Sequence, residues 1–304
     1  MRNKLPTLAS IFAFSLLAGT LHAADEAYPV KLFQPDVVGS VEDVHYVLEQ
    51  RSESTIALPS RDPQVATKVM KGDLTGRTET LAVDGAGLPT SIKLTVKKLL
   101  RADGRDMIKP GAVVEIHRTP AESTFKPGEG VVISDEAKAF LTLLFPKLSS
   151  AGSGDLVFGS VTPRKAGESW EINKDEAVKM MATQGTKVSA RDIQGKTTLK
   201  AVEMVDGKPT LRVVSNLNAQ NVALAEAPQL NGCEMKMTQT LLQPADPALP
   251  PLEMSMAMDM NMHMLNPSNQ ASAEIKVHVT MNFSGTVVVN PLAKATADAG
   301  SPQH

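Results

Sequence analysis

The sequence predicts an α+β protein made mainly of antiparallel β-structure, arranged as a strongly curved sheet or open barrel with two short helices. Three observations predict this class. Apolar and polar residues alternate with a period of two along most of residues 39–290, which is typical of strands with one buried face. Asp-Gly turn signals separate several of these runs. Two segments instead begin with a capping residue and continue with apolar residues at helical spacing.

Composition limits the class of protein. The chain has 304 residues, of which 42% are apolar and 21% are charged, so it can bury a core. Its 31 basic and 33 acidic residues give a net charge of −2. This balance argues against a nucleic-acid partner, because phosphate binding needs a surplus of basic residues. The single cysteine excludes a disulfide scaffold.

The first segment, residues 1–23, has the pattern of a signal peptide. Arg2 and Lys4 precede an apolar run, and Ala23 supplies the small residue expected before a cleavage site. The run is too short to span a bilayer, and no later run is long enough. We therefore expect an exported protein, periplasmic or secreted, with no membrane span after cleavage.

The remainder divides into three parts. Residues 24–38 form an N-terminal lead-in without periodicity. Residues 39–290 form a single β-rich domain, whose two sheet-forming parts are joined through residues 126–185. Residues 291–304 are rich in Ala, Pro and polar residues, and are expected to be a disordered tail.

The strands follow from alternation. Val44, Tyr46 and Leu48 should share one face of the first long strand. In the segment 91–100, alternation places one set of residues on a common face: Ile92, Leu94, Val96, Lys98 and Leu100. Turns are expected at 83–85, at 103–104 and at Asp206-Gly207. Basic residues gather near the second strand, a pattern typical of a solvated sheet edge: Lys93, Lys97, Lys98, Arg101, Arg105 and Lys109.

The two helices belong to an internal repeat. Ser134 and Asn173 are capping residues, each followed by acidic residues and an apolar stripe. Each is preceded by the pattern K-x-G-E-x-x-x-I, at a spacing of 39 residues between Lys126 and Lys165. Each copy therefore predicts a glycine turn, a short strand and a capped helix. The Gly-rich run at 151–154 lacks the Lys-Ser/Thr of a phosphate-binding loop.

The most unusual segment is 253–264, in which every second residue is methionine. Only a β-strand places these six on one face: Met254, Met256, Met258, Met260, Met262 and Met264. The segments 233–242 and 273–284 continue the pattern, so three consecutive antiparallel strands are expected.

One register that matches apolar with apolar residues predicts four pairs. Met258 lies opposite Met237 and Val279, Met256 lies opposite Met281, and Asp259 lies across from His278. This last pair is typical of a surface ion pair.

Three interpretations of the methionine face remain open. It could be a half-buried core face, because methionine fills irregular gaps. It could be a deformable surface that binds an apolar ligand, such as a lipid, an acyl chain or an unfolded polypeptide segment, or another envelope component, through Met237, Met256, Met258, Met260 and Met281. It could also be a Cu(I) site, since thioethers and thiolates select soft metals. The ligands would then be Cys233, Met235 and Met260, with Met237 and Met262 nearby.

The sequence contains no recognisable catalytic motif. There is no G-x-S-x-G, no H-E-x-x-H and no cysteine in a catalytic context. We therefore expect no enzymatic activity and no cofactor. A hydrolase without a recognisable motif ranks third, behind a binding or structural protein and a soft-metal protein.

These features resemble those of bacterial exported β-rich proteins of unknown function. The resemblance is carried by long antiparallel strands, by the G-x-x-W turn from Gly167 to Trp170, and by strands that alternate in methionine. The general shape is also similar to lipoprotein-carrier-like (LolA/LprG-like) folds, in which a curved sheet wraps an apolar cavity. That likeness implies binding of acyl chains, and it assigns no individual residue a role.

Overall fold

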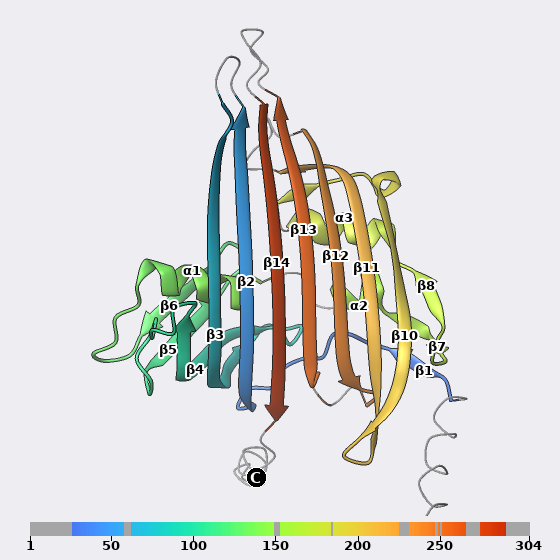
Figure 1. Cartoon of the computed structure of the whole chain (residues 1–304). Helices are drawn as coiled ribbons and strands as arrows, with labels where there is room; N and C mark the ends of the chain where they lie inside the picture. Colours follow the sequence, from blue (N-terminus) through green and yellow to red (C-terminus); the bar gives the residue numbers. More distant parts are fainter. Residues whose placement is uncertain are drawn as a thin grey trace, which may run out of the picture.

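The structure is a computed structural model (Figure 1), and it describes residues 26–57, 62–148, 153–183, 185–224, 231–246, 249, 251–265 and 274–289. The expected signal peptide and the expected C-terminal tail lie outside these residues. The described chain is dominated by one open antiparallel sheet of twelve strands. Mainly antiparallel β-structure is therefore confirmed.

Strands make up most of the described chain. The long strands of the large sheet are β2 (Val41–Ala57), β3 (Gln64–Val83), β4 (Pro89–Arg101), β10 (Ile193–Val205), β11 (Lys208–Leu224), β12 (Asn231–Pro244), β13 (Glu253–Leu265) and β14 (Glu274–Val289). Its shorter strands are β5 (Val113–Arg118), β6 (Ser123–Pro127), β8 (Ser169–Glu171) and β9 (Thr186–Lys187). A separate two-stranded sheet joins β1 (Tyr28–Val30) to β7 (Ser160–Arg164).

Three α-helices accompany the sheet, one more than expected. They are α1 (Asp135–Leu144), α2 (Ser153–Phe158) and α3 (Lys174–Thr183), and a 3₁₀ turn covers Ala190–Asp192. The unexpected helix, α2, includes part of the Gly-rich run, whose composition disfavours a helix. It is fixed by packing, because Val157 and Phe158 at its end are buried against the neighbouring core.

The strand order explains the internal repeat. The sheet runs β6-β5-β4-β3-β2-β14-β13-β12-β11-β10-β8, so β6 and β8 are its two ends. Each end strand leads into a capped helix, α1 after β6 and α3 after β8. Ser134 accepts a hydrogen bond from the Ala137 N–H at 3.2 Å, and Asn173 accepts one from the Glu176 N–H at 3.3 Å. The second copy forms the expected glycine turn, short strand and capped helix, but in the first copy β6 ends at Pro127, before the turn, and residues 131–133 are not a strand. The expected strand of the first copy is therefore wrong, and what the two copies share is the capped helix.

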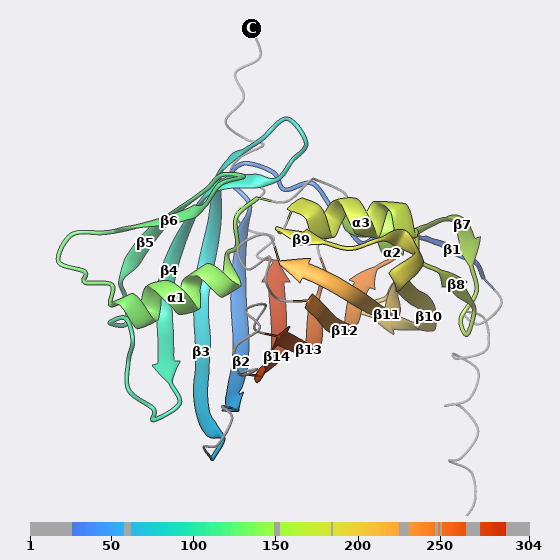
Figure 2. The same ribbon diagram turned by 90° about the horizontal axis from the view of Figure 1, so that it is seen from above.

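All three helices lie on the same face of the sheet, which we call the inner face. Cross-strand pairing carries one row of inner-face positions across six strands: Leu217, Met237, Met258, Met281, Gln50 and Met70. Leu217 packs in the core beneath α3, whereas Met70 packs against the core beneath α1. Figure 2 shows α1 on one half of the sheet and α2 and α3 on the other.

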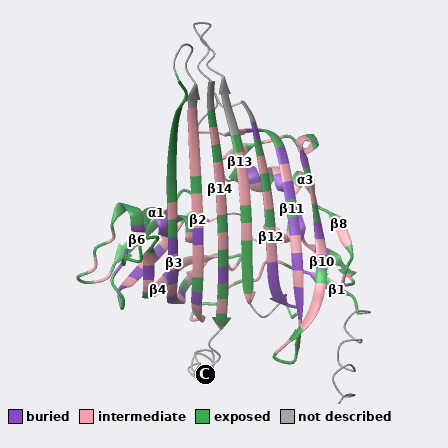
Figure 3. Cartoon of the chain, in the orientation of Figure 1, coloured by how far each residue is buried: buried purple, intermediate pink, exposed green. Residues whose placement is uncertain are grey.

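The buried residues form two main cores rather than one. The first joins α1 to β2–β5 and includes Leu48, Leu74 and Phe140. The second joins α2 and α3 to β10–β12 and includes Met181, Leu217 and Cys233. No residue of β13 belongs to either core among the described residues. Figure 3 shows the same pattern, with buried segments on both sides of the central strands.

A bulge corrects the expected face of Lys98 and Leu100. Ile92, Leu94 and Val96 are buried as expected, but the next buried residue is Leu99. The register shifts there, because Thr75 pairs with Lys98 and the next residue, Gly76, pairs with Val96. The extra residue, Lys97, reverses the alternation, which simple parity cannot anticipate.

The opposite, outer face is polar and carries cross-strand ion pairs. Lys93 contacts Glu79 at 2.9 Å, Lys97 contacts Asp43 at 2.7 Å, and Lys98 contacts Asp73 at 2.7 Å. β4 lies between β3 and β5, so the expectation that these lysines mark a sheet edge is wrong. The basic cluster instead meets acidic residues on its neighbours.

The finer expectation of a strongly curved sheet or open barrel is not confirmed, because the sheet neither closes nor curls strongly on itself. Within the described part of the chain, no helix is both long enough and apolar enough to cross a bilayer.

Candidate binding site

The three methionine-bearing segments form consecutive antiparallel strands, as expected. β12, β13 and β14 pair in sequence order, and their Met, Val and Phe side chains occupy the inner face. The residues proposed from sequence as ligand contacts therefore lie on one face of three adjacent strands: Met237, Met256, Met258, Met260 and Met281.

The expected register is correct between β12 and β13 but wrong between β13 and β14. Met258 pairs with Met237, as expected, but on its other side it pairs with Met281 rather than Val279. Met256 likewise pairs with Phe283 rather than Met281. The error is a slip of two residues between β13 and β14. Such a slip keeps every side chain on its face, so the apolar pattern cannot distinguish the two registers.

The slip also changes the polar pair on the outer face. Asp259 pairs through its backbone with Thr280, whereas His278 pairs with Asn261. The direct pairing predicted for Asp259 and His278 is therefore wrong. Their side chains nevertheless meet diagonally, with His278 Nε2 at 3.3 Å from Asp259 Oδ2.

The centre of the inner face is an apolar surface that we call the methionine stripe. It consists of six residues on β13 and β14: Met256, Met258, Met260, Val279, Met281 and Phe283. Each is only partly buried, in contrast to the fully buried residues of the two cores. Met281 and Phe283 touch the core beneath α1, and Met235 and Met237 on β12 touch the core beneath α3. The stripe thus lies between the two cores and belongs fully to neither.

Aromatic residues bound the lower end of the stripe, toward the end of β14. Tyr46 packs against Phe283, with ring centroids 5.7 Å apart, and meets Phe145 edge to face at 6.2 Å. Gly285 lies opposite Tyr46 and leaves room for its ring. The three aromatic rings therefore pack together on the inner face at this end of the stripe.

The N-terminal lead-in forms a strap that connects the two halves of the molecule. At one end, the Phe33 N–H donates to Asp155 of α2 at 2.9 Å, and the Leu32 N–H donates to the same carboxylate. At the other end, the Asp36 N–H donates to the Gly87 carbonyl at 2.8 Å. The lead-in, which showed no periodicity, thus contains strand β1 and a well-bonded crossing segment.

Acidic groups gather where the strap meets β2. Burial, and then the nearby charge of Asp36, raises the pKa of Glu42 to about 7. Burial also raises the pKa of Asp36, opposed by the positive charge of Arg118. The pKa of Tyr46 is raised by burial and by these two carboxylates. The lower end of the inner face therefore disfavours further negative charge.

Positive charge appears at the other end. Lys68 on β3 occupies an inner-face position, because it pairs with Ser52, which pairs with Val279 of the stripe. Its side chain is exposed. Among the described inner-face side chains of β2, β3, β12, β13 and β14, Lys68 and Glu42 are the two that carry formal charge.

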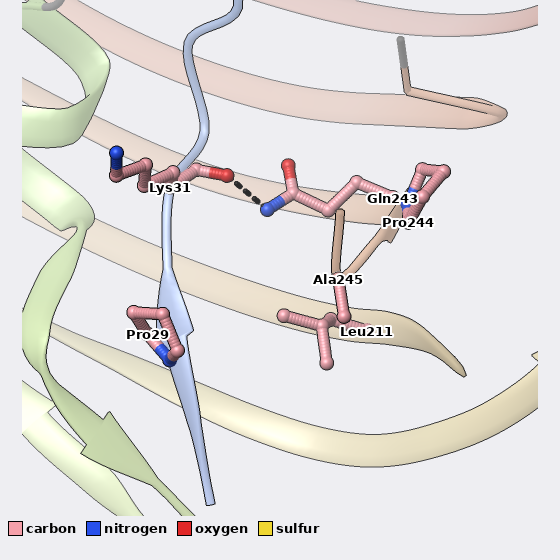
Figure 4. Close-up of a pocket in the computed structure, with 6 residues that line it drawn as sticks. All are labelled: Pro29, Lys31, Leu211, Gln243, Pro244 and Ala245. Carbon is pink, nitrogen blue, oxygen red and sulfur yellow. Dashed lines mark hydrogen bonds between the residues drawn. The ribbon is translucent and has the colours of Figure 1, made fainter. Parts of the chain in front are cut away.

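Two hollows lie away from the stripe. One, of about 100 Å³, forms where the strap meets the end of β12; in Figure 4, the Gln243 side chain reaches toward the Lys31 carbonyl, to which its Nε2 donates. The other, of about 440 Å³, lies mostly on polar outer-face residues of β10–β12 and reaches Met237 at its border. Neither of these two hollows is lined by residues of the methionine stripe.

The alternative soft-metal set is only partly assembled. Met235 and Met260 pair directly across β12 and β13. Cys233 has 0% exposure, inside the core beneath α3, and an irregularity in pairing separates it from that register. The side chain of Met262 lies outside the described residues. Among the residues that are described, no cluster of three or more His, Cys, Asp or Glu could hold a metal.

Several features of the site were missed from sequence. The stripe's aromatic border, the strap and the opposed charges of Glu42 and Lys68 all depend on pairings between segments far apart in the chain. Alternation alone did place Tyr46 and Leu48 on one face. The signal that could have placed Lys68 is its parity with Met70 in a strand that was not assigned.

Comparisons with known proteins identify no family. No family model and no curated protein matches the chain. Among solved structures, one described by lipid–protein interactions in lipovitellin is similar at a TM-score of 0.34 and 9% identity, over 90% of this chain and 26% of that one. The chain thus spans about a quarter of the length of that protein.

Two further likenesses are weaker. DynF, from the dynemicin biosynthesis pathway of Micromonospora chersina, has a TM-score of 0.18 at 7% identity, over 93% of this chain and 94% of its own. A LolA superfamily protein from Nitrosomonas europaea has a TM-score of 0.13 at 8% identity, over 81% and 87%. At such scores these likenesses carry no argument about function.

Proposed function

We propose that this chain is an exported, non-catalytic binding protein of the bacterial envelope, and that it holds an apolar ligand on the methionine stripe. The observation that carries the proposal is the partial exposure of Met256, Met258 and Met260 between two well-buried cores. A strand that served only as core would be buried, as Leu74 of β3 and Leu217 of β11 are on either side of the centre of the sheet. An apolar ligand would remove this surface from water, at roughly 25 cal/mol per Å².

Methionine suits such a surface for a physical reason. Its unbranched side chain and polarizable sulfur adapt to ligands of different shape, whereas Leu, Ile and Val present stiffer surfaces. The two cores are built mainly from these stiffer residues and Phe, for example Leu94, Ile116 and Phe140. The change of residue type at the stripe supports binding in preference to packing.

The envelope location rests on the signal-peptide pattern of residues 1–23. An apolar ligand in that compartment needs a protein surface that shields it from water. The protein requires no catalytic group for this role.

Binding of the neutral fluorophore N-phenylnaphthylamine tests the proposal. We expect fluorescence to rise with the native chain, and Met258→Asp to weaken binding about tenfold or more, because a carboxylate would then face the ligand. The matched control is Ala257→Asp, which introduces the same charge at the adjacent, exposed outer-face position. This control should bind as the native chain does.

Thermal melts establish that each variant is folded. If Met258→Asp were too unstable to measure, Met260→Gln would give a milder polar change on the same surface. The proposal is wrong if the native chain does not bind the probe, or if folded Met258→Asp or Met260→Gln binds it as well as Ala257→Asp does.

A further inference from the structure

The methionine stripe has a charge gradient along its length. Its lower end lies near Glu42 and Asp36, and its upper end lies near Lys68. Three steps of two residues separate the Tyr46 row from the Ser52 row on β2, which is roughly 20 Å of strand. A ligand that follows the strands therefore meets aromatic rings and two acids, one of them facing Arg118, at one end, and Lys68, unpaired within the described part of the chain, at the other.

From this arrangement we infer that the ligand is a single-chain aliphatic anion, a free fatty acid in its chemistry, with its carboxylate at Lys68 and its methyl end toward Tyr46. This inference rests on the proposed function and names its ligand class. Lys68 has no ion pair among the described residues, whereas the neighbouring Lys71 on the outer face contacts Glu49 at 3.1 Å. The charge on Lys68 is therefore available to a ligand.

The reverse orientation is disfavoured by charge. Glu42 occupies an inner-face position of β2 at this end, with Asp36 beside it, and the one cation there among the described residues, Arg118, already faces Asp36. A third carboxylate would therefore meet two acidic groups and a cation that is already engaged, which is unfavourable. An uncharged methyl end meets no such cost against Tyr46 and Phe283, whose rings present apolar surface.

An extended polypeptide fits this surface less well. Each central strand is already paired on both sides, so the sheet offers no backbone groups to a peptide that lies on its face. The amides of such a peptide would be buried against thioethers without partners, which is costly. An aliphatic chain has no such groups.

A second copy of the chain is disfavoured by area. Three rows on two strands cover roughly 200 Å², from strand spacings of about 4.8 Å and row spacings of about 7 Å. A stable interface buries about 800 Å² per partner. The helices beside the stripe would also obstruct a flat approach.

Three ligands with the same chain separate the headgroup from the chain: myristate, tetradecanol and tetradecyltrimethylammonium. Isothermal titration or displacement of the fluorophore measures each affinity at low salt. We expect the affinity to decrease from the anion to the alcohol to the cation. The anion should bind about three- to tenfold more tightly than the alcohol, because one partly exposed ion pair contributes a free energy of that size. Added salt should reduce this difference.

Variants of Lys68 then assign the position of the carboxylate. Lys68→Gln should abolish the preference for myristate over tetradecanol and leave tetradecanol binding unchanged. Lys68→Glu should favour the alkylammonium. Lys71→Gln, three residues away on the outer face, is the matched control and should leave all three affinities unchanged.

The outcomes distinguish the inference from the proposed function. Equal binding of all three ligands, unaffected by Lys68→Gln, would refute the headgroup assignment and leave the apolar stripe in place. Failure of all three ligands and of the fluorophore would refute both. If the protein were a dimer in solution, and if dimer formation prevented the fluorophore from binding, the stripe would be an interface with a second copy. That result would also overturn the inference.

Discussion

Gly285 on β14 lies directly opposite Tyr46 on β2, and a Cβ atom at Gly285 would stand 2.7 Å from Tyr46 Cδ1. The absence of a side chain at Gly285 therefore leaves room for the Tyr46 ring at the end of the methionine stripe. In that position the ring contacts both Phe283 and Phe145.

Gly285→Ala should destabilise the fold because the new methyl group displaces this ring. We expect a loss of about 1–3 kcal/mol in the free energy of unfolding, the usual cost of overpacking. Chemical denaturation measures it. Ser284→Ala, at the adjacent exposed position, should change stability by less than about 0.5 kcal/mol. Gly285→Ala should destabilise the Tyr46→Ala variant less than it destabilises the native chain. An equal loss of unfolding free energy in both would show that contact with the Tyr46 ring is not the cause.

Stability should depend on pH through Glu42. Burial raises the pKa of this carboxyl from its ordinary value of 4.5 to about 7 in the folded chain, so the folded state binds its proton more tightly. The resulting stabilisation is fully present below pH 4.5 and is lost as pH rises through about 7. Glu42→Gln should therefore stabilise the protein at pH values above this range, by about 1–3 kcal/mol.

Denaturation curves at several pH values check the expected crossover. Asp36, Arg118 and Tyr46 face the same region and are present in both the native chain and the Glu42→Gln variant. The difference between the two pH profiles therefore reports the contribution of Glu42. Glu49→Gln, which removes a carboxyl on the outer face, is the control. A pH profile unchanged by Glu42→Gln would show that Glu42 titrates normally.

Local chemistry made much of the fold predictable. The caps at Ser134 and Asn173 act within three residues, so sequence alone was enough to place both helix starts. The turn at Asp206-Gly207 was equally local, and both residues have the positive φ angles, 50° and 74°, that this turn requires.

The features that the sequence did not predict depend on contacts between segments that are far apart in the chain. The slip between β13 and β14 preserves the apolar face, so Met258 could equally well have met Val279 or Met281. The bulge at Lys97 and the strap contacts of Phe33 with Asp155 depend on partners that no local pattern reveals. The stripe could therefore be predicted as a face, but its borders and charges could not.

Export should leave a defined N-terminus. The small residue Ala23 after the apolar run predicts that the mature chain begins at Ala24 or Asp25. N-terminal sequencing of protein recovered outside the cytoplasm measures this directly. An intact Met1 on that protein would contradict the proposed processing.

Copper binding provides the last test, because the apolar and soft-metal interpretations use the same strands. We expect no change in melting temperature with excess Cu(I) under reducing conditions, since Cys233 is buried in the core beneath α3 and only Met235 and Met260 pair directly. A ligand that binds only the native state, present at about 100 times its Kd, would add about 2.7 kcal/mol to the free energy of unfolding, which gives a readily measured shift in melting temperature.

Met258→Leu, which keeps volume and apolarity, should lower the free energy of unfolding by less than about 1.5 kcal/mol and leave the copper result unchanged. A copper-induced shift that disappears when Cys233, Met235 and Met260 are replaced together by Ala, Leu and Leu would favour the soft-metal interpretation. A shift that survives this replacement would place the metal elsewhere on the chain.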